Sequence, residues 1–148
     1  MNRRRDDQGN ALVEFVYLGV LLMVPLIYAL LTAFQVQSAA FGATEAARQA
    51  ARAYVRADTV QDAQQHADAA AALAMADQGV RDSDPPQIAC PAGCLTPGSP
   101  VTVTVHYRVP LLLLGALFSR SSAPGIPITA VHTQTVDRFQ DSRAEPTG

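Results

Sequence analysis

The sequence has no lysine and no tryptophan, and only two of its 148 residues are cysteines. All eleven basic residues are therefore arginines, and thirteen acidic residues bring the formal net charge to -2. Proteins that bind nucleic acid usually carry an excess of positive charge. We therefore expect no nucleic-acid partner for this chain.

Recognisable catalytic motifs are also missing. The chain contains no Gly-x-Ser-x-Gly, no glycine-rich phosphate-binding loop and no His-Glu-x-x-His. His66 lies among Ala and Asp residues, as a surface histidine would. We therefore expect no enzymatic activity, no cofactor, no metal site and no small-molecule substrate.

One long apolar run is present at residues 11–34, ALVEFVYLGVLLMVPLIYALLTAF. As a helix it would be roughly 36 Å long, and the hydrocarbon core of a bilayer is about 30 Å thick. The run is therefore long enough to cross a membrane. Arginines at positions 3–5 precede it, and the positive-inside rule then predicts a cytoplasmic N-terminus and an exported C-terminal part.

A cleaved secretory signal peptide is the alternative interpretation of this segment. Its apolar region would normally be about 7–15 residues long and would be followed by a small-residue cleavage site. The Ser-Ala-Ala at 38–40 could provide such a site. The longer run and the acid inside it, Glu14, favour a retained membrane helix.

The N-terminal residues resemble those of a known family. The arginines at 3–5, then Gly9, then Glu14 five residues later and the apolar run are similar to a type IV prepilin N-terminus. The version here, Gly-Asn-Ala-Leu-Val-Glu-Phe, most resembles the TadE-like pseudopilins of tight-adherence (Flp) pilus systems. Those proteins often carry a proline inside the helix, as Pro25 is here, and then a helical stretch rich in Ala and Arg, as at residues 43–52.

The resemblance implies a minor pilin or pseudopilin of the cytoplasmic (inner) membrane. A prepilin peptidase would cut between Gly9 and Asn10, although Asn10 departs from the apolar or small residue usual there. Glu14 and Phe15 would then take part in assembly with other pilins and pilus assembly proteins. A free amine and a carboxylate attract strongly where water is scarce, so Glu14 of one subunit can pair with the new amine of its neighbour. The competing class is a signal-anchored or secreted binding protein that does not polymerise.

Pro25 lacks the N–H of one helical hydrogen bond and predicts a kink. The kink can be a plain bend, which we favour, or it can ease extraction from the bilayer. Beyond the apolar run the helix should continue to about residue 56, with arginines four residues apart on one side. That basic stripe, Arg48, Arg52 and Arg56, is interpreted as a solvated face rather than a headgroup contact.

The next segment predicts a second helix. Asp58 or Thr59 can cap it, and Gly79 can end it after about Asp77. Small residues recur on one side of each helix and would allow close approach in an antiparallel hairpin. The expected seam of the first helix is Val36, Ala40, Ala43, Ala47, Ala50 and Tyr54, and that of the second is Val60, Ala63, Ala67, Ala70 and Ala74.

We expect residues 81–100, which are rich in Pro and Gly and contain Cys90 and Cys94, to form a loop. Three intervening residues with a turn can bring the two Cα atoms within disulfide range, and an exported location permits the bond. The alternative is half of a metal site completed by His106 and His132. We favour the disulfide, because zinc ligands usually come in closely spaced pairs.

The C-terminal part predicts strands. Residues 101–109, VTVTVHYRV, alternate strictly between apolar and polar, and 126–136 form a second strand. Between them, the apolar residues 111–118 are too few to span a bilayer. We interpret them as core, with a subunit-contact patch as the alternative.

The predicted fold is an α+β, membrane-anchored, pilin-like protein with a long N-terminal transmembrane helix, a second short helix and a small antiparallel sheet. Its organisation would be a basic leader at 1–9, a transmembrane and continuing helix at 10–56, an exported domain at 57–139 and a flexible tail at 140–148.

Overall fold

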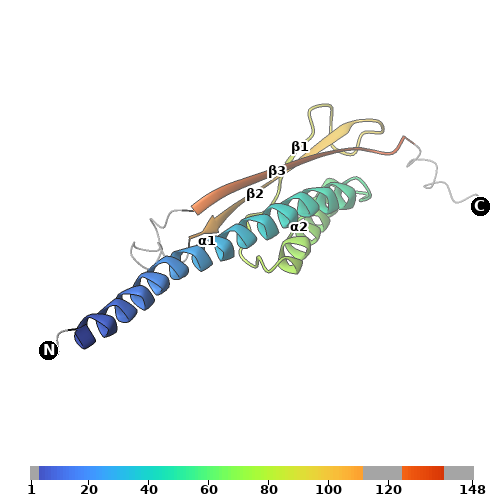
Figure 1. The fold of residues 1–148 in the computed structure, drawn as a ribbon. Coiled ribbons are helices and arrows are strands. Elements are labelled where there is room, and N and C mark those ends of the chain that lie inside the picture. Colours follow the sequence, from blue (N-terminus) through green and yellow to red (C-terminus); the bar gives the residue numbers. More distant parts are fainter. Residues whose placement is uncertain (1–3, 112–124, 139–148) are drawn as a thin grey trace, which may run out of the picture. The chain divides into compact units, whose positions relative to one another are not determined.

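The computed structural model describes residues 4–111 and 125–138, with side chains from residue 11 onward (Figure 1). It contains helices α1 (Arg4–Tyr54) and α2 (Val60–Asp77) and strands β1 (Gln87–Ala89), β2 (Pro100–Pro110) and β3 (Gly125–Thr135). The chain divides into two compact units, Met1–Gln35 and Val36–Gly148. The second unit therefore includes the C-terminal part of α1, α2 and the sheet. The predicted layout of a long apolar helix, a second helix and a small antiparallel sheet is confirmed.

The boundaries of α2 follow local hydrogen bonds. Thr59 is the N-cap: its hydroxyl accepts from the Asp62 backbone N–H at 3.1 Å and donates to the Asp62 carboxylate at 2.8 Å. The helix ends at Asp77 with Gln78 as its C-cap, and the next residue, Gly79, has a φ of +79°. The Val80 N–H donates to the Met75 carbonyl at 3.0 Å and the Gly79 N–H to Ala76 at 2.9 Å, which is a Schellman motif. The predicted start and stop of this helix are thus confirmed, and Thr59 rather than Asp58 is its cap.

The second unit has one hydrophobic core made of alanines from both helices and valines from β2. The C-terminal part of α1 and α2 form the predicted antiparallel hairpin (Figure 1). The Ser38 hydroxyl of α1 donates to the carbonyl of Gln78, at the end of α2, at 3.2 Å. A Cβ on Gly42 would lie only 3.1 Å from the Gln78 side chain, so the two helices are close there. The core is formed by Ala39, Ala43, Ala46, Ala47, Ala50, Ala51, Tyr54, Val55, Ala57, Ala63, Ala67, Ala71, Ala74, Met75, Val80, Val101, Val103, Val105, Val109 and Val136.

The predicted seams were only partly right. On α2, Val60 is 51% exposed and Ala70 is half-buried, whereas Ala71 and Met75 are buried. Five α2 residues are buried, at positions 63, 67, 71, 74 and 75. The buried side therefore includes Ala71 and Met75 in place of Ala70, and Val60 is the first residue of the helix, before the buried stretch begins. On α1 the buried arc is broader than one seam, because both α2 and the sheet pack against this helix within the second unit.

The sheet has the order β1-β2-β3 and both pairings are antiparallel. Val101, Val103, Val105 and Val109 are buried on the core face and the intervening residues are half-buried or exposed, which confirms the alternation predicted for this strand. The second predicted strand is also confirmed, as β3. Burial on the core side raises the pKa of the half-buried Tyr107, and the negative charge of Asp82 raises it further.

The assignment of residues 81–100 to a loop throughout was wrong, because β1 lies inside it. This strand of three residues pairs with Thr102–Thr104, at the N-terminal half of β2. It is too short to show alternation, and the prolines before it mask its strand character. The predicted apolar segment at 111–118, apart from half-buried Leu111, and the predicted tail at 140–148 lie outside the described residues.

Candidate functional site

The apolar residues of α1 at positions 11–27 are exposed on every side of the helix. Phe15 is 78% exposed, Leu22 74% and Ile27 48%. The richest window of 18 residues has a mean hydropathy of 2.3, and none of it is buried. A helix that is apolar all round needs a lipid or protein environment to cover it. This segment is long and apolar enough to cross a membrane.

Glu14 lies in this apolar surface, one helical turn after Asn10. Its neighbours Val13 and Phe15 are 65% and 78% exposed. Among residues 11–111 and 125–138, whose side chains are described, Glu14 has no hydrogen-bond or ion-pair partner. A carboxylate removed from water without a partner is strongly penalised. If lipid or protein covers this part of the helix, the Glu14 carboxylate must therefore either stay in contact with water or pair with a cation.

The other N-terminal residues singled out from the sequence also lie in α1. The bond between Gly9 and Asn10 lies in its first turns, and Pro25 lies inside it with helical residues on both sides. Pro25 cannot donate to the carbonyl of Leu21, four residues before it. Near it, the Thr32 hydroxyl donates to the Tyr28 carbonyl at 2.9 Å, a contact within one helical turn. Peptidase cleavage and the kink stay predictions.

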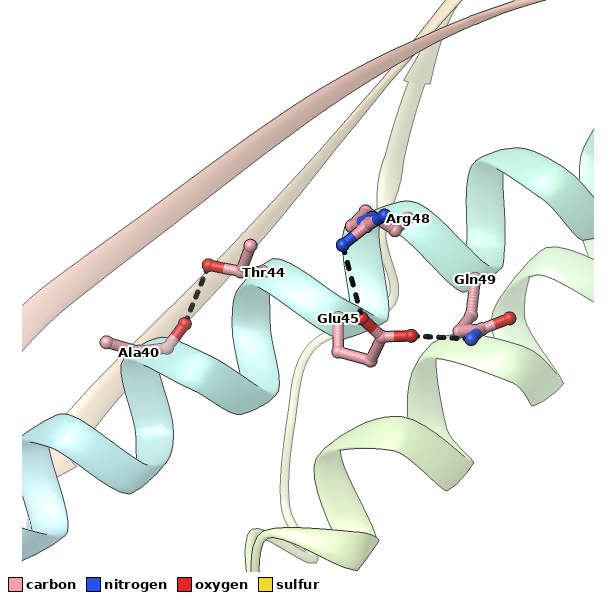
Figure 2. A network of polar contacts seen from close by, with 5 residues as sticks. All are labelled: Ala40, Thr44, Glu45, Arg48 and Gln49. Carbon is pink, nitrogen blue, oxygen red and sulfur yellow. Dashed lines mark hydrogen bonds and ion pairs between the residues drawn. The ribbon is translucent and has the colours of Figure 1, made fainter.

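Arg48 and Arg52 of the basic stripe lie on the exposed side of α1, whereas Arg56 lies in the turn that follows the helix. Arg48 Nη1 lies 3.9 Å from Glu45 Oε2, and the other oxygen of Glu45 accepts from the Gln49 side chain (Figure 2). Arg52 and Arg56 are exposed. Isolated surface ion pairs contribute little to stability, typically about 0–1 kcal/mol. The stripe is therefore solvated in the single chain, as the sequence predicted.

A shallow groove of about 400 Å³ lies between α1 and α2 within the second unit. Its wall has apolar residues from α2, and its rim carries the carboxylates Glu45 and Asp77 with the amides of Gln49 and Gln78. This set contains no nucleophile paired with a base. Among the described residues, no group of three His, Cys, Asp or Glu side chains could hold a metal ion.

Cys90 and Cys94 follow β1 directly and are joined by a disulfide, with their Cα atoms 5.1 Å apart. Gly93, between them, has a φ of +100° and donates to the Cys90 carbonyl at 3.2 Å, which closes the turn. The Tyr54 hydroxyl lies 3.7 Å from Cys90 Sγ. A disulfide sulfur has no proton to donate, so the hydroxyl is the donor in this contact. The bridge therefore touches the C-terminal end of α1.

The disulfide should form outside the cytoplasm and contribute modestly to stability. Because its loop is so short, it constrains the unfolded chain little, and we expect Cys90→Ser with Cys94→Ser to lower the free energy of unfolding by about 1–2 kcal/mol. Thiol labelling of native protein with and without reductant measures the bond itself. Two reactive thiols in protein taken from outside the cytoplasm would contradict this prediction.

The sequence pointed to Glu14, Phe15, Pro25 and the two cysteines, and the structure places them in two separate sets. The first three lie on the exposed helix of the first unit, and the cysteines lie in the second unit. The contact between Tyr54 and the disulfide was missed. The spacing of Tyr54 predicts a place in the helix seam and does not indicate the loop that lies against it. Comparisons with protein-family models, with curated proteins and with solved structures found no match to this chain.

Proposed function

We propose that the protein is a TadE-like minor pilin or pseudopilin of a Flp-type pilus or related secretion system. In this proposal it is anchored in the cytoplasmic membrane with its N-terminus inside and its second unit exported, and it assembles through α1 after processing by a prepilin peptidase. The observation that carries the proposal is Glu14: an acid with no partner among the described side chains, five residues after Gly9, on a stretch of α1 (residues 11–27) whose side chains are all exposed.

The chemistry of assembly follows from that position. Cleavage after Gly9 would leave a free α-amino group on Asn10. In a filament whose apolar helices pack together, water is scarce and an amine–carboxylate pair is strongly attractive. Glu14 would then take its cation from the neighbouring subunit rather than from its own chain. A head-to-tail contact of this kind generates an open helical polymer.

The core of the second unit supports retention of the whole helix. A signal peptidase acting after residues 38–40 would cut α1 where Ala39 is only 2% exposed and Ser38 is hydrogen-bonded to Gln78. That cut would detach part of the buried side of α1 from the domain it stabilises. A helix that both anchors the chain and supplies its core is what an assembly subunit requires.

We expect the mature protein to begin at Asn10. Mass spectrometry of the protein isolated from its native host measures this directly. Gly9→Leu should block processing, because the residue before the cut must be small. The matched control is Gly19→Leu, where a side chain meets nothing within 4 Å, and this variant should be cut normally.

A mature N-terminus other than Asn10 would indicate a different class of protein. A mature chain that begins at Phe41 would show an ordinary secretory signal peptide. A chain that keeps Met1 would indicate a signal-anchored protein that is not processed as a pilin. Equal processing of the Gly9→Leu and wild-type proteins would also contradict the proposed cut.

A further inference from the structure

Strand β3 is one of the two edge strands of the sheet and has no Asp, Glu, Lys or Arg along its whole length, GIPITAVHTQT. Sheet edges are normally protected by charged side chains, bulges, short strands or prolines, because their open N–H and C=O groups can pair with another strand. Here β3 pairs with β2 from Gly125 to Thr135 without a skipped position, and within the described residues no strand pairs with its other side. Its only built-in protection is Pro127.

The prolines show which residues of β3 point their N–H groups outward. Opposite residues in an antiparallel pair alternate between exchanging hydrogen bonds and exchanging none. Pro100, Pro110 and Pro127 have no N–H, and in the register with β2 all three occupy pairs of the same class. That class cannot be the hydrogen-bonded one. The next pair beyond the ladder agrees, since the Val136 N–H donates to the Ser99 carbonyl at 3.0 Å.

The outward hydrogen-bonding groups of β3 therefore belong to Thr129, Val131, Thr133 and Thr135. Their side chains also share the exposed face of the sheet, and Val131 is 62% exposed. On the core face, Ala130 and His132 are only half-buried, whereas Val103 and Val105 of β2 are at most 1% exposed. The hydrophobic core is therefore only partly covered along β3, the same strand whose outward backbone N–H and C=O groups are unpaired within the described residues.

We propose that β3 pairs with β3 of a second copy of this chain, antiparallel and about a two-fold axis at Val131. This register sets Val131 against its own copy and Thr129 against Thr133, so that the exposed apolar side chain is covered and threonines meet threonines. One cross-strand threonine pair is already present in the sheet, where the Thr102 and Thr133 hydroxyls are 3.0 Å apart. Pro127 then falls opposite Thr135, near the end of the paired stretch, where its missing N–H interrupts least. The pairing joins two second units and does not depend on the proposed function of α1.

The test uses the full-length chain in detergent micelles, with a cysteine at Val131. Directly opposite residues in a hydrogen-bonded antiparallel pair have Cα atoms about 5.5 Å apart, which is within disulfide range. Val131→Cys should therefore give a covalent dimer under mild oxidation. Thr104→Cys is the matched control, because Thr104 shares that face and lies opposite Val131 on the interior strand. It should stay monomeric.

A second variant separates pairing from folding. Val131→Pro removes an outward N–H that β2 does not use, as Pro127 already does, so the sheet should form. The association constant of the full-length chain, measured by sedimentation equilibrium, should fall about tenfold or more, because this position lies at the centre of the ladder. Val131→Thr, which keeps the N–H, should associate as wild type. Equal cross-linking at 104 and 131, or unchanged association of a folded Val131→Pro variant, would overturn the proposal.

Discussion

Replacing Glu14 with alanine should leave membrane insertion and processing intact but abolish assembly. Removal of an acid from an apolar helix makes insertion easier, since a central acid costs about 2.5–3.5 kcal/mol on insertion scales. Loss of the carboxylate leaves the neighbour's amine unpaired in a water-poor contact. Breaking a buried ion pair by removing one partner costs about 3–5 kcal/mol, which lowers an association constant by two to four orders of magnitude.

The measurement is filament formation, or co-purification with other pilins, in a strain that carries the variant. Glu14→Gln should fail as well, because it keeps the shape of the side chain and loses its charge. Glu45→Ala is the matched control on the same helix: Glu45 is exposed, and its partners among the described residues are its neighbours Arg48 and Gln49. Normal assembly by Glu14→Ala would rule out the pairing mechanism, even if the protein proved to be anchored in the membrane.

The elements with strong local signals could be predicted from the sequence. The strict alternation of 101–109 gave β2, with Val101 and Val103 buried as expected. Thr59 and Gly79 bounded α2, because capping and a positive φ are local requirements. Glu14 could be singled out because an acid inside an apolar run is costly wherever the fold places it.

Features that depend on distant partners could not be predicted in this way. The strand β1 forms because its backbone pairs with β2, and three residues are too few to show the alternation of polar and apolar residues that indicates a strand. The buried side of α1 is wider than its periodicity suggested, because two elements pack on it. Ala46 and Ala51 were therefore missed, although both are fully buried. The open edge of β3 became visible only once the strand order was known.

Tyr54 is the largest side chain among the small residues that line the second half of α1. It is 2% exposed, and its ring fills a larger part of the core than the alanines at the other buried positions of this helix. Its hydroxyl contacts Cys90 Sγ across 36 residues of sequence. One side chain thus contributes both to the hydrophobic core and to the position of the loop that carries the disulfide.

Tyr54→Ala should destabilise the second unit by about 3–5 kcal/mol, the range found when large buried aromatic residues are truncated. Tyr54→Phe is the matched control. It keeps the ring and loses one weak contact to sulfur, so its cost should stay within about 1.5 kcal/mol. Denaturant unfolding of the full-length chain in detergent, followed by circular dichroism, compares the two variants.

The outcome also tests whether the two units are independent. Tyr54 lies in the second unit, outside the apolar segment of the first unit. The Tyr54→Ala variant should therefore still insert into membranes and be processed. Its second unit should become sensitive to protease. Wild-type stability in Tyr54→Ala would show that the ring is not part of the core. A Tyr54→Phe variant as unstable as Tyr54→Ala would place the energy in the contact with the disulfide, because that contact is all the phenylalanine removes.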